Sequence, residues 1–160
     1  MNLFRFSPAE GRALLVAAVL SVCTAVRADF RIQLTRDAAL LARADASAQS
    51  VGTSRVGEIL FAKAASGGFY AVSAPEAARV WLSRDLVENS RIAARSALVR
   101  TGPGIACERV GELPRGTRVM ALAEDGEWCQ IAAPSTLTVY VDAASVVQLP
   151  PAGSAGESAA

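Results

Sequence analysis

Residues 117–131 read TRVMALAEDGEWCQI, and this stretch decides the fold class. An apolar stretch over residues 117–122 ends at the turn Glu124-Asp125-Gly126, and the alternating run Trp128-Cys129-Gln130-Ile131 follows it. Because side chains alternate between the two faces of a strand, Cys129 and Ile131 share one face and Trp128 lies on the other. The stretch therefore predicts two short β-strands joined by a tight turn.

Other short apolar segments surround this pair of strands. Leu98-Val99-Arg100 precedes the turn residues Gly102-Pro103-Gly104, and two further segments close the series, Val139-Tyr140-Val141 and Val146-Val147. Strand signals that recur every eight to twelve residues or so, with glycine-rich turns between them, are typical of a small barrel or sandwich. The expected fold class is therefore all-β.

The chain repeats itself with an offset of 59 residues and no gaps. The matched positions are Val51-Gly52 with Val110-Gly111, Gly57 with Gly116, Gly67 with Gly126, Ala74-Pro75 with Ala133-Pro134, and Val80-Trp81-Leu82 with Val139-Tyr140-Val141. A unit of this length is the size of a small domain, so the repeat predicts two tandem barrels, at residues 29–88 and 89–148. The alternative is one larger β-sandwich built from both halves.

The two ends of the chain differ in composition from the repeats. Residues 1–28 contain Arg5 and Arg12, then an apolar run over residues 13–26, then the small residue Ala28, which predicts a signal peptide. The run is shorter than the roughly 20 residues of a transmembrane helix, so we expect no membrane span after cleavage and a periplasmic or secreted protein. An uncleaved anchor is the alternative. Residues 149–160 are rich in Pro, Gly, Ser and Ala and predict a disordered tail.

The charge of the chain argues against a nucleic-acid partner. Removal of residues 1–28 would leave 13 basic and 14 acidic residues, and the basic ones are scattered along the chain. Such a surface produces no positive field that would attract phosphate backbones.

Catalytic and metal-binding residues are not predicted. The sequence contains no histidine, which removes Cys-His and Ser-His nucleophile pairs and histidine metal sites. Lys63 is the only lysine, and Leu60 stands where a Ser-x-x-Lys motif requires serine. We interpret the acidic residues of the turns as surface residues. The protein is therefore expected not to be an enzyme and to need no cofactor.

Two cysteines remain beyond the predicted signal peptide, Cys107 and Cys129. Export would place them in an oxidising compartment, where an even pair favours a disulfide. Two free thiols that pack as small hydrophobic side chains are the alternative.

The second repeat resembles the bacterial SH3-like domain family, known as SH3b. The resemblance rests on five motifs in order: Val99-Arg100-Thr101-Gly102-Pro103, Val110-Gly111-Glu112-Leu113, Arg115-Gly116-Thr117, Gly126-Glu127-Trp128 and Tyr140-Val141. The first repeat is similar to a degenerate copy, because Leu41-Ala42-Arg43-Ala44-Asp45 lacks the Gly-Pro turn. The resemblance implies five-stranded, partly open barrels outside the cytoplasm that bind peptidoglycan, peptides or a neighbouring domain.

The resemblance also implies a binding groove. Trp128 matches the groove tryptophan of the SH3 fold, and Phe69 takes its place in the first repeat. We expect ligand contacts from Trp128, Gly102, Pro103, Glu124 and Asp125, because loops on a rigid scaffold carry recognition. Trp128 could instead brace the barrel.

The groove implied by the resemblance is incomplete at the last turn. Asp142 and Ser145 stand there in the second repeat, with Ser83 and Leu86 in the first, where the SH3 fold has Pro and Tyr. Polyproline recognition is therefore not favoured. Trp81 and Tyr140, which stand between aliphatic residues in strands, are assigned to packing.

The function expected from the sequence is that of an exported, non-catalytic binding or adaptor module. Its partner would be a cell-wall glycan peptide or an envelope protein. The alternative is a structural docking subunit of an envelope assembly that binds no small ligand.

Overall fold

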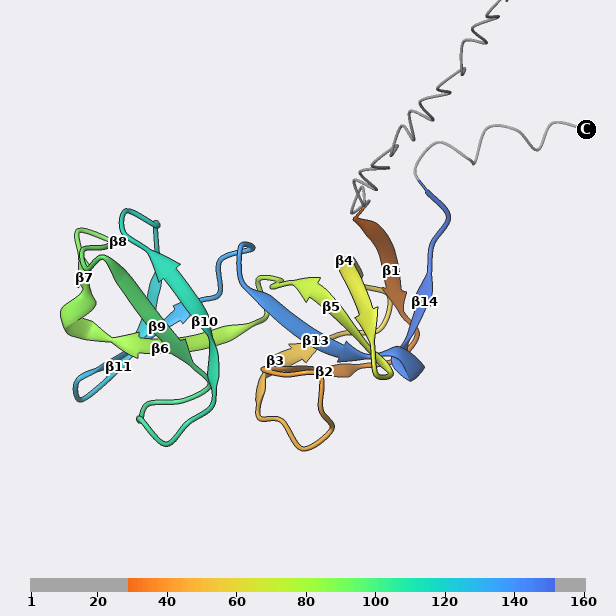
Figure 1. Cartoon of the computed structure of the whole chain (residues 1–160), viewed down its shortest axis with the longest axis horizontal. Coiled ribbons are helices and arrows are strands. Elements are labelled where there is room, and N and C mark those ends of the chain that lie inside the picture. The colour runs from red at the N-terminus through yellow and green to blue at the C-terminus, as the bar shows by residue number, and fades with distance from the viewer. Residues whose placement is uncertain (1–28, 152–160) are drawn as a thin grey trace, which may run out of the picture.

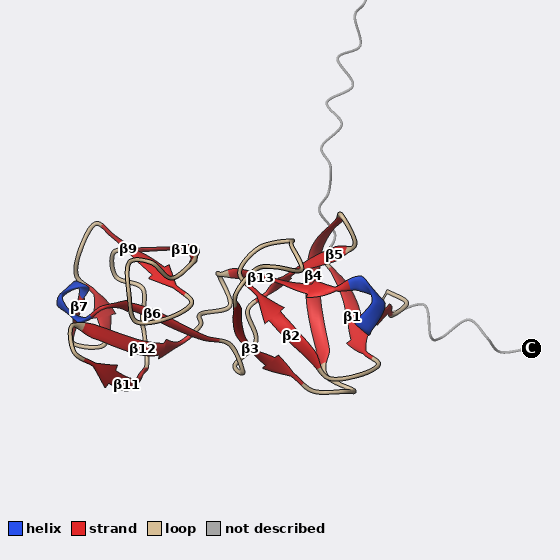
Figure 2. Ribbon diagram, turned by 90° about the horizontal axis from the view of Figure 1, so that it is seen from below, coloured by secondary structure: helices blue, strands red, loops and turns tan. Residues whose placement is uncertain are grey.

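The computed structural model of the chain describes residues 29–151, which contain fourteen β-strands and two short 3-10 helices. The elements of the first half are β1 (Phe30–Leu34), β2 (Ala38–Leu41), β3 (Ser50–Ser54), β4 (Ile59–Ser66), β5 (Phe69–Ser73), β6 (Arg79–Ser83), η1 (Arg84–Leu86) and β7 (Val87–Glu88). Those of the second half are β8 (Arg91–Ile92), β9 (Ser96–Arg100), β10 (Arg109–Pro114), β11 (Ala121–Asp125), β12 (Trp128–Ala132), β13 (Thr138–Asp142), η2 (Ala143–Ser145) and β14 (Val146–Gln148). The all-β prediction is confirmed (Figure 2).

The strands form two bodies that do not follow the order of the repeats. One sheet has the order β14-β1-β4-β5-β13-β2-β3, and we call it the first barrel. The other has the order β10-β9-β6-β12-β11, and together with the β7-β8 pair we call it the second barrel. Figure 1 shows β13 running beside β5 in one body while β6 runs through the other.

The repeats therefore exchange their last strands. Residues 79–88 of the first range pair within the second barrel, and residues 138–148 of the second range pair within the first. The linkers 74–78 and 133–137 cross between the bodies. The ranges 29–88 and 89–148 thus describe the repeats of the sequence, whereas each sheet combines strands from both.

The linkers that cross between the barrels contact each other symmetrically. Ala74 donates its backbone N–H to the carbonyl of Leu137 at 2.9 Å, and Ala133 donates to the carbonyl of Ala78 at 3.1 Å. Ala74 and Ala133 are 59 residues apart, as are Ala78 and Leu137. Equivalent positions of the two repeats thus make equivalent bonds, as expected around an approximate twofold axis.

The exchanged strands fill the cores of the barrels that they enter. Val80 and Leu82 of β6 are fully buried, and the intervening Trp81 is half-buried on the outward face. Val139 and Val141 of β13 are buried in the same alternating pattern. Because side chains alternate along a strand, one face of β6 and one face of β13 are apolar. Each of the two strands can therefore fill the core of either barrel.

The segment that indicated the fold class forms its strands with one shift. The strand predicted at residues 117–122 begins only at Ala121, because residues 118–120 make a single bridge and no continuous ladder. Cys129 and Ile131 lie together in the core, as the alternation predicts.

Only a short part of the two predicted end segments can be described. The predicted signal peptide, residues 1–28, and residues 152–160 of the predicted tail lie outside the described residues. The first residues of that tail lie along β1, where Leu149 donates its N–H to the carbonyl of Arg31 at 2.8 Å. Between residues 29 and 151, no helix has the length and apolar character of a membrane span.

Gly52 is expected to tolerate no larger residue, because the linker of the exchange passes directly over it. A Cβ at Gly52 would lie 2.6 Å from the backbone carbonyl oxygen of Ala77. Gly52→Ala should therefore lower the free energy of unfolding by roughly 1–2 kcal/mol, measured by urea denaturation. Gly104→Ala is the matched control, because its Cβ would meet only Cys107 Sγ at 3.8 Å. An equal loss in both variants would contradict this explanation.

Candidate functional site

Both tryptophans of the chain lie on the outward face of the second barrel. Trp128 on β12 pairs with Ser83 on β6, and Gln130 pairs with Trp81. Trp128 and Trp81 are therefore diagonal neighbours on adjacent antiparallel strands, at a distance that large side chains span. Both are half-buried, with their inward neighbours Leu82 and Cys129 in the core. We call this surface the tryptophan face.

Strand exchange creates the tryptophan face. Trp81 belongs to the first repeat and Trp128 to the second, and they lie on neighbouring strands only because β6 pairs with β12. On the other side of β6, Trp81 pairs with Arg100 of β9. Arg100 is held in place, because its Nη1 donates to the carbonyl of Cys107 at 2.9 Å. The two indoles offer stacking surfaces, and Arg100 and Gln130 beside them offer hydrogen-bond donors. Tryptophan and arginine are residue types enriched in binding hot spots.

The predicted ligand-binding residues separate into two groups. Asp125 pairs with Trp128 and therefore borders the tryptophan face, whereas Glu124 pairs with the inward-facing Cys129 and lies on the other side of the sheet. Arg84 of η1 forms an exposed ion pair with Glu124, in which Nη1 of Arg84 lies 3.6 Å from Oε2 of Glu124.

Gly102 and Pro103 lie elsewhere. Trp81 pairs with Arg100, and β6 and β9 are antiparallel, so the residues that follow Arg100 lie toward Arg79 at the start of β6. Trp128 pairs with Ser83, at the other end of β6. The structure therefore does not bring the Gly-Pro loop to Trp128.

The loop that contains Gly102 and Pro103, residues 101–108, contacts the equivalent loop of the first repeat, residues 42–49. Gln49 donates its backbone N–H to Glu108 Oε2 at 2.6 Å, and Glu108 donates its N–H to Gln49 Oε1 at 3.1 Å. Arg43 adds an ion pair to Glu108. This loop therefore holds the two repeats together.

The acidity of Glu108 is expected to report this loop contact. The Gln49 N–H, followed by the Arg43 guanidinium, holds the pKa of Glu108 below its ordinary value of 4.5. A carboxyl with a lowered pKa stabilises the folded state above its unfolded pKa, and this contribution is lost as the pH falls through the folded pKa. In an NMR titration, the Gln49 amide shift should follow a pKa below 4.5. A midpoint at or above that value would contradict the contact.

A cavity of about 350 Å³ lies in the first barrel around Phe69, at the position equivalent to Trp128. Asp142 pairs with Phe69, and Ser145 accepts a hydrogen bond from Arg36 Nε at 2.9 Å. Asp142 and Ser145 belong to the last turn of the repeat that contains Trp128, so the sequence predicts that they lie beside Trp128. This prediction is wrong. They lie beside Phe69, and Ser83 lies beside Trp128, because the last turns are exchanged along with their strands.

The disulfide predicted between Cys107 and Cys129 is not formed, because the structure has both as free cysteines. Cys129 is buried on the inward face of β12, whereas Cys107 is partly exposed in the loop beside Gly102 and Gly104. Burial, followed by the charge of Glu124, raises the pKa of the Cys129 thiol. Cys129 therefore behaves as a small core residue with little thiolate character.

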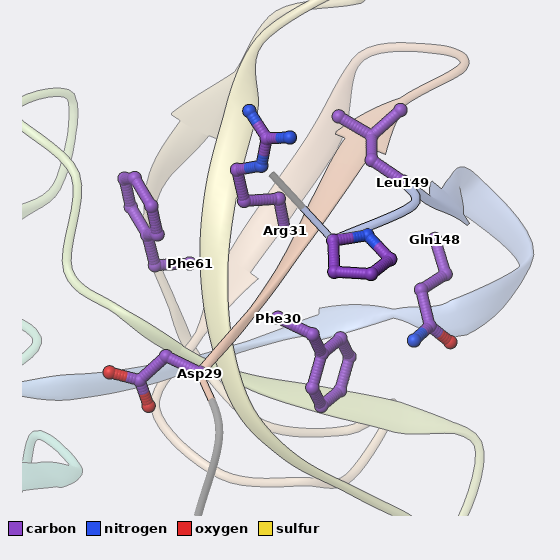
Figure 3. Close-up of a pocket in the computed structure, with 7 residues that line it drawn as sticks. Asp29, Phe30, Arg31, Phe61, Gln148 and Leu149 are labelled. Carbon is purple, nitrogen blue, oxygen red and sulfur yellow. The ribbon is translucent and has the colours of Figure 1, made fainter. Parts of the chain in front are cut away.

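A second cavity, of about 370 Å³, lies where the described chain begins and ends. Asp29, Phe30 and Arg31 of the β1 region and Gln148, Leu149 and Pro151 of the last segment line it, together with Phe61 of β4 (Figure 3). Phe61 is 56% exposed, and Ile59 and Val147 on the same outward face are 45% and 48% exposed. These three side chains form what we call the apolar patch of the first barrel.

The described part of the chain contains no cluster of side chains that could bind a metal ion. No group of three or more Cys, Asp or Glu residues between residues 29 and 151 is arranged to hold a metal ion.

A comparison with known protein families matches the part of the chain that contains most strands of the second barrel. Residues 96–147 match the bacterial SH3 domain family. The matched segment begins at β9 and extends through β13 and η2, which lie in the first barrel. Searches of curated proteins and of solved structures found no match. The strands β9 to β12 of the matched segment form one sheet with β6 from the preceding repeat.

Proposed function

We propose that this protein is an exported, non-catalytic binding module of the cell envelope, located in the periplasm or secreted. Its tryptophan face recognises a cell-wall glycan peptide. The observation that carries the proposal is the diagonal placement of Trp81 and Trp128 on adjacent strands, on the outward face of the sheet that contains most of the residues matching the bacterial SH3 domain family. Half-exposed indoles present large, rigid surfaces that stack on sugar rings and peptide planes and lose little entropy on binding.

The tandem arrangement belongs to the same proposal. The first repeat is a degenerate copy of the bacterial SH3 domain, and its contribution to the face is the strand β6. The equal offset of the hydrogen bonds in the two linkers supports a duplication. In the first barrel the smaller Phe69, beside a cavity, stands at the position of Trp128. Because the larger indole is in the second barrel, ligand binding resides mainly there.

A sedimentation assay with insoluble peptidoglycan tests this function. The folded protein should be retained on the polymer, and heat-denatured protein serves as the control for nonspecific adsorption. Retention no greater than that of the control would refute recognition of the cell wall.

A structural docking role is the second candidate, and the apolar patch of the first barrel favours it. An exposed apolar surface beside a cavity is characteristic of a protein contact. A stoichiometric protein recovered from the native envelope with the wild type, and lost with Phe61→Ser, would favour this function. Arg31→Ala, within the same face, is the polar control.

A further inference from the structure

A single short turn joins the two repeats. Asn89 and Ser90 form it, between β7, the last strand of the first repeat, and β8, the first strand of the second. Each barrel combines strands of both repeats. The fold therefore requires one first repeat and one second repeat, but the two need not belong to the same copy of the chain.

The turn between β7 and β8 is strained. Asn89 and Ser90 have φ angles of 50° and 59°, in the left-handed region that residues other than glycine disfavour. Two-residue hairpin turns of this kind usually contain glycine, and neither position has one. Strands β7 and β8 contribute two residue pairs to the hairpin. A short hinge loop under strain favours the exchange of segments between copies of a chain.

The equivalent pair of strands in the first barrel forms without a connecting turn. There β14 pairs with β1, which are the last and the first strands of the described chain. The hydrogen bonds around the two pairs correspond. Leu34 donates its N–H to the carbonyl of Glu58 at 3.0 Å in the first barrel, and Ile92 donates to Thr117 at 3.0 Å in the second. Two strands in this position can therefore close a barrel although no turn links them.

The register of the hairpin allows the turn to open into a strand that pairs with the same strand of a second copy. The two pairs of the hairpin are Val87 with Ile92 and Glu88 with Arg91. They are symmetric about the bond between Asn89 and Ser90, so two extended copies of residues 87–92 would form the same pairs between them. Residues 88–91 are exposed, and Figure 1 shows β7 and β8 at the end of the second barrel that lies away from the first. The hinge is therefore accessible to a second copy.

We propose that the chain forms a dimer by exchanging whole repeats between two copies, with residues 87–92 as the hinge. The first repeat of each copy folds with the second repeat of the other, so both resulting bodies retain the strand pairs of the single chain. A continuous strand replaces the turn, which releases Asn89 and Ser90 of both copies from the left-handed region. Because two copies lose translational freedom when they join, the dimer is favoured at high protein concentration.

The exchange makes each tryptophan face a joint product of two copies. Trp81 belongs to the first repeat and Trp128 to the second, so each face combines Trp81 of one copy with Trp128 of the other. The dimer presents two such faces on one molecule. The inference rests on the geometry of the hinge and does not depend on what the tryptophan face binds.

Refolding of the full chain from urea at low and at high protein concentration tests the proposal. Size-exclusion chromatography with light scattering should find monomer after refolding at low concentration and a growing fraction of dimer at high concentration. The repeats must separate before they can exchange, so the dimer should persist after dilution, with a lifetime set by unfolding. A wild-type chain that is monomeric at every concentration, or a dimer that dissociates at once on dilution, would overturn the proposal.

Substitutions at Ser90 change the strain of the closed turn in both directions. Ser90→Gly removes the strain and should lower the dimerisation constant at least about tenfold, whereas Ser90→Val increases it and should raise the constant. Ser66→Gly is the matched control, because Ser66 is exposed at the end of β4 and its φ is not positive. This variant should dimerise like the wild type. Equal dimerisation of the wild type and Ser90→Gly would refute the hinge.

Isotope-filtered nuclear Overhauser effects identify which copy contributes each strand. Dimers are refolded from a mixture of labelled and unlabelled chains. The exchanged dimer predicts cross-peaks between Val80 of one copy and Ile131 of the other, because these residues pair on β6 and β12. A dimer in which the Val80–Ile131 cross-peaks remain within one chain would assign the association to an outer surface and contradict the exchange of repeats.

Discussion

Leu82→Ala is expected to lower the free energy of unfolding by about 2–5 kcal/mol, the usual cost of truncating a buried leucine. Leu82 is fully buried and pairs with Cys129, so the cavity would open in the second barrel although the residue belongs to the first repeat. Native-state hydrogen exchange should show the loss of protection mainly at amides such as Val99 and Ile131.

Val141→Ala is the matched control, because Val141 occupies the equivalent position of β13 and is fully buried in the first barrel. Its loss of protection should concentrate at Val72 of β5, whose strand neighbours β13. A Leu82→Ala variant that loosens Val72 more than Ile131 would contradict the exchange of strands.

Trp128→Ala should weaken binding to soluble peptidoglycan fragments by about 2 kcal/mol or more, which is a roughly 30-fold loss. The indole is half-buried beside Trp81, so truncation removes stacking surface from the centre of the tryptophan face. Trp81→Ala should produce a loss of similar size, because the two residues act on one surface. Isothermal titration calorimetry provides the measurement.

Phe69→Ala is the control for this loss, since Phe69 occupies the position in the first barrel that is equivalent to Trp128. Circular dichroism and thermal denaturation verify that each variant is folded, because the Trp128 side chain is half-buried. A folded Trp128→Ala variant with wild-type affinity, or a larger loss in Phe69→Ala, would refute the assignment of binding to the second barrel.

The strands themselves could be predicted because their signals are local. The alternation of Trp128 to Ile131 determines which side chains enter the core, and the structure buries Cys129 and Ile131 accordingly. The same rule, applied to Val80-Trp81-Leu82, places the tryptophan outward between two buried aliphatic residues. The assignment of Trp81 to packing overlooked this alternation.

The partner of each strand could not be predicted from such signals. Strands β6 and β13 have the same pattern of one aromatic between two aliphatic residues, so each satisfies either core. Whether the linkers turn back or cross is decided by contacts between distant residues, such as Ala74 with Leu137. The proximity of Trp81 to Trp128, and the separation of Gly102 from Trp128, both follow from that choice.

Strand exchange is the central claim, because the tryptophan face exists only if β6 lies beside β12. Backbone nuclear Overhauser effects test it directly in the unmodified protein. The exchanged arrangement predicts cross-peaks between Val72 and Val139 and between Ile131 and Val80, which are paired residues. Cross-peaks between Val72 and Val80, together with cross-peaks between Ile131 and Val139, would mean that each repeat closes on itself and would contradict the account.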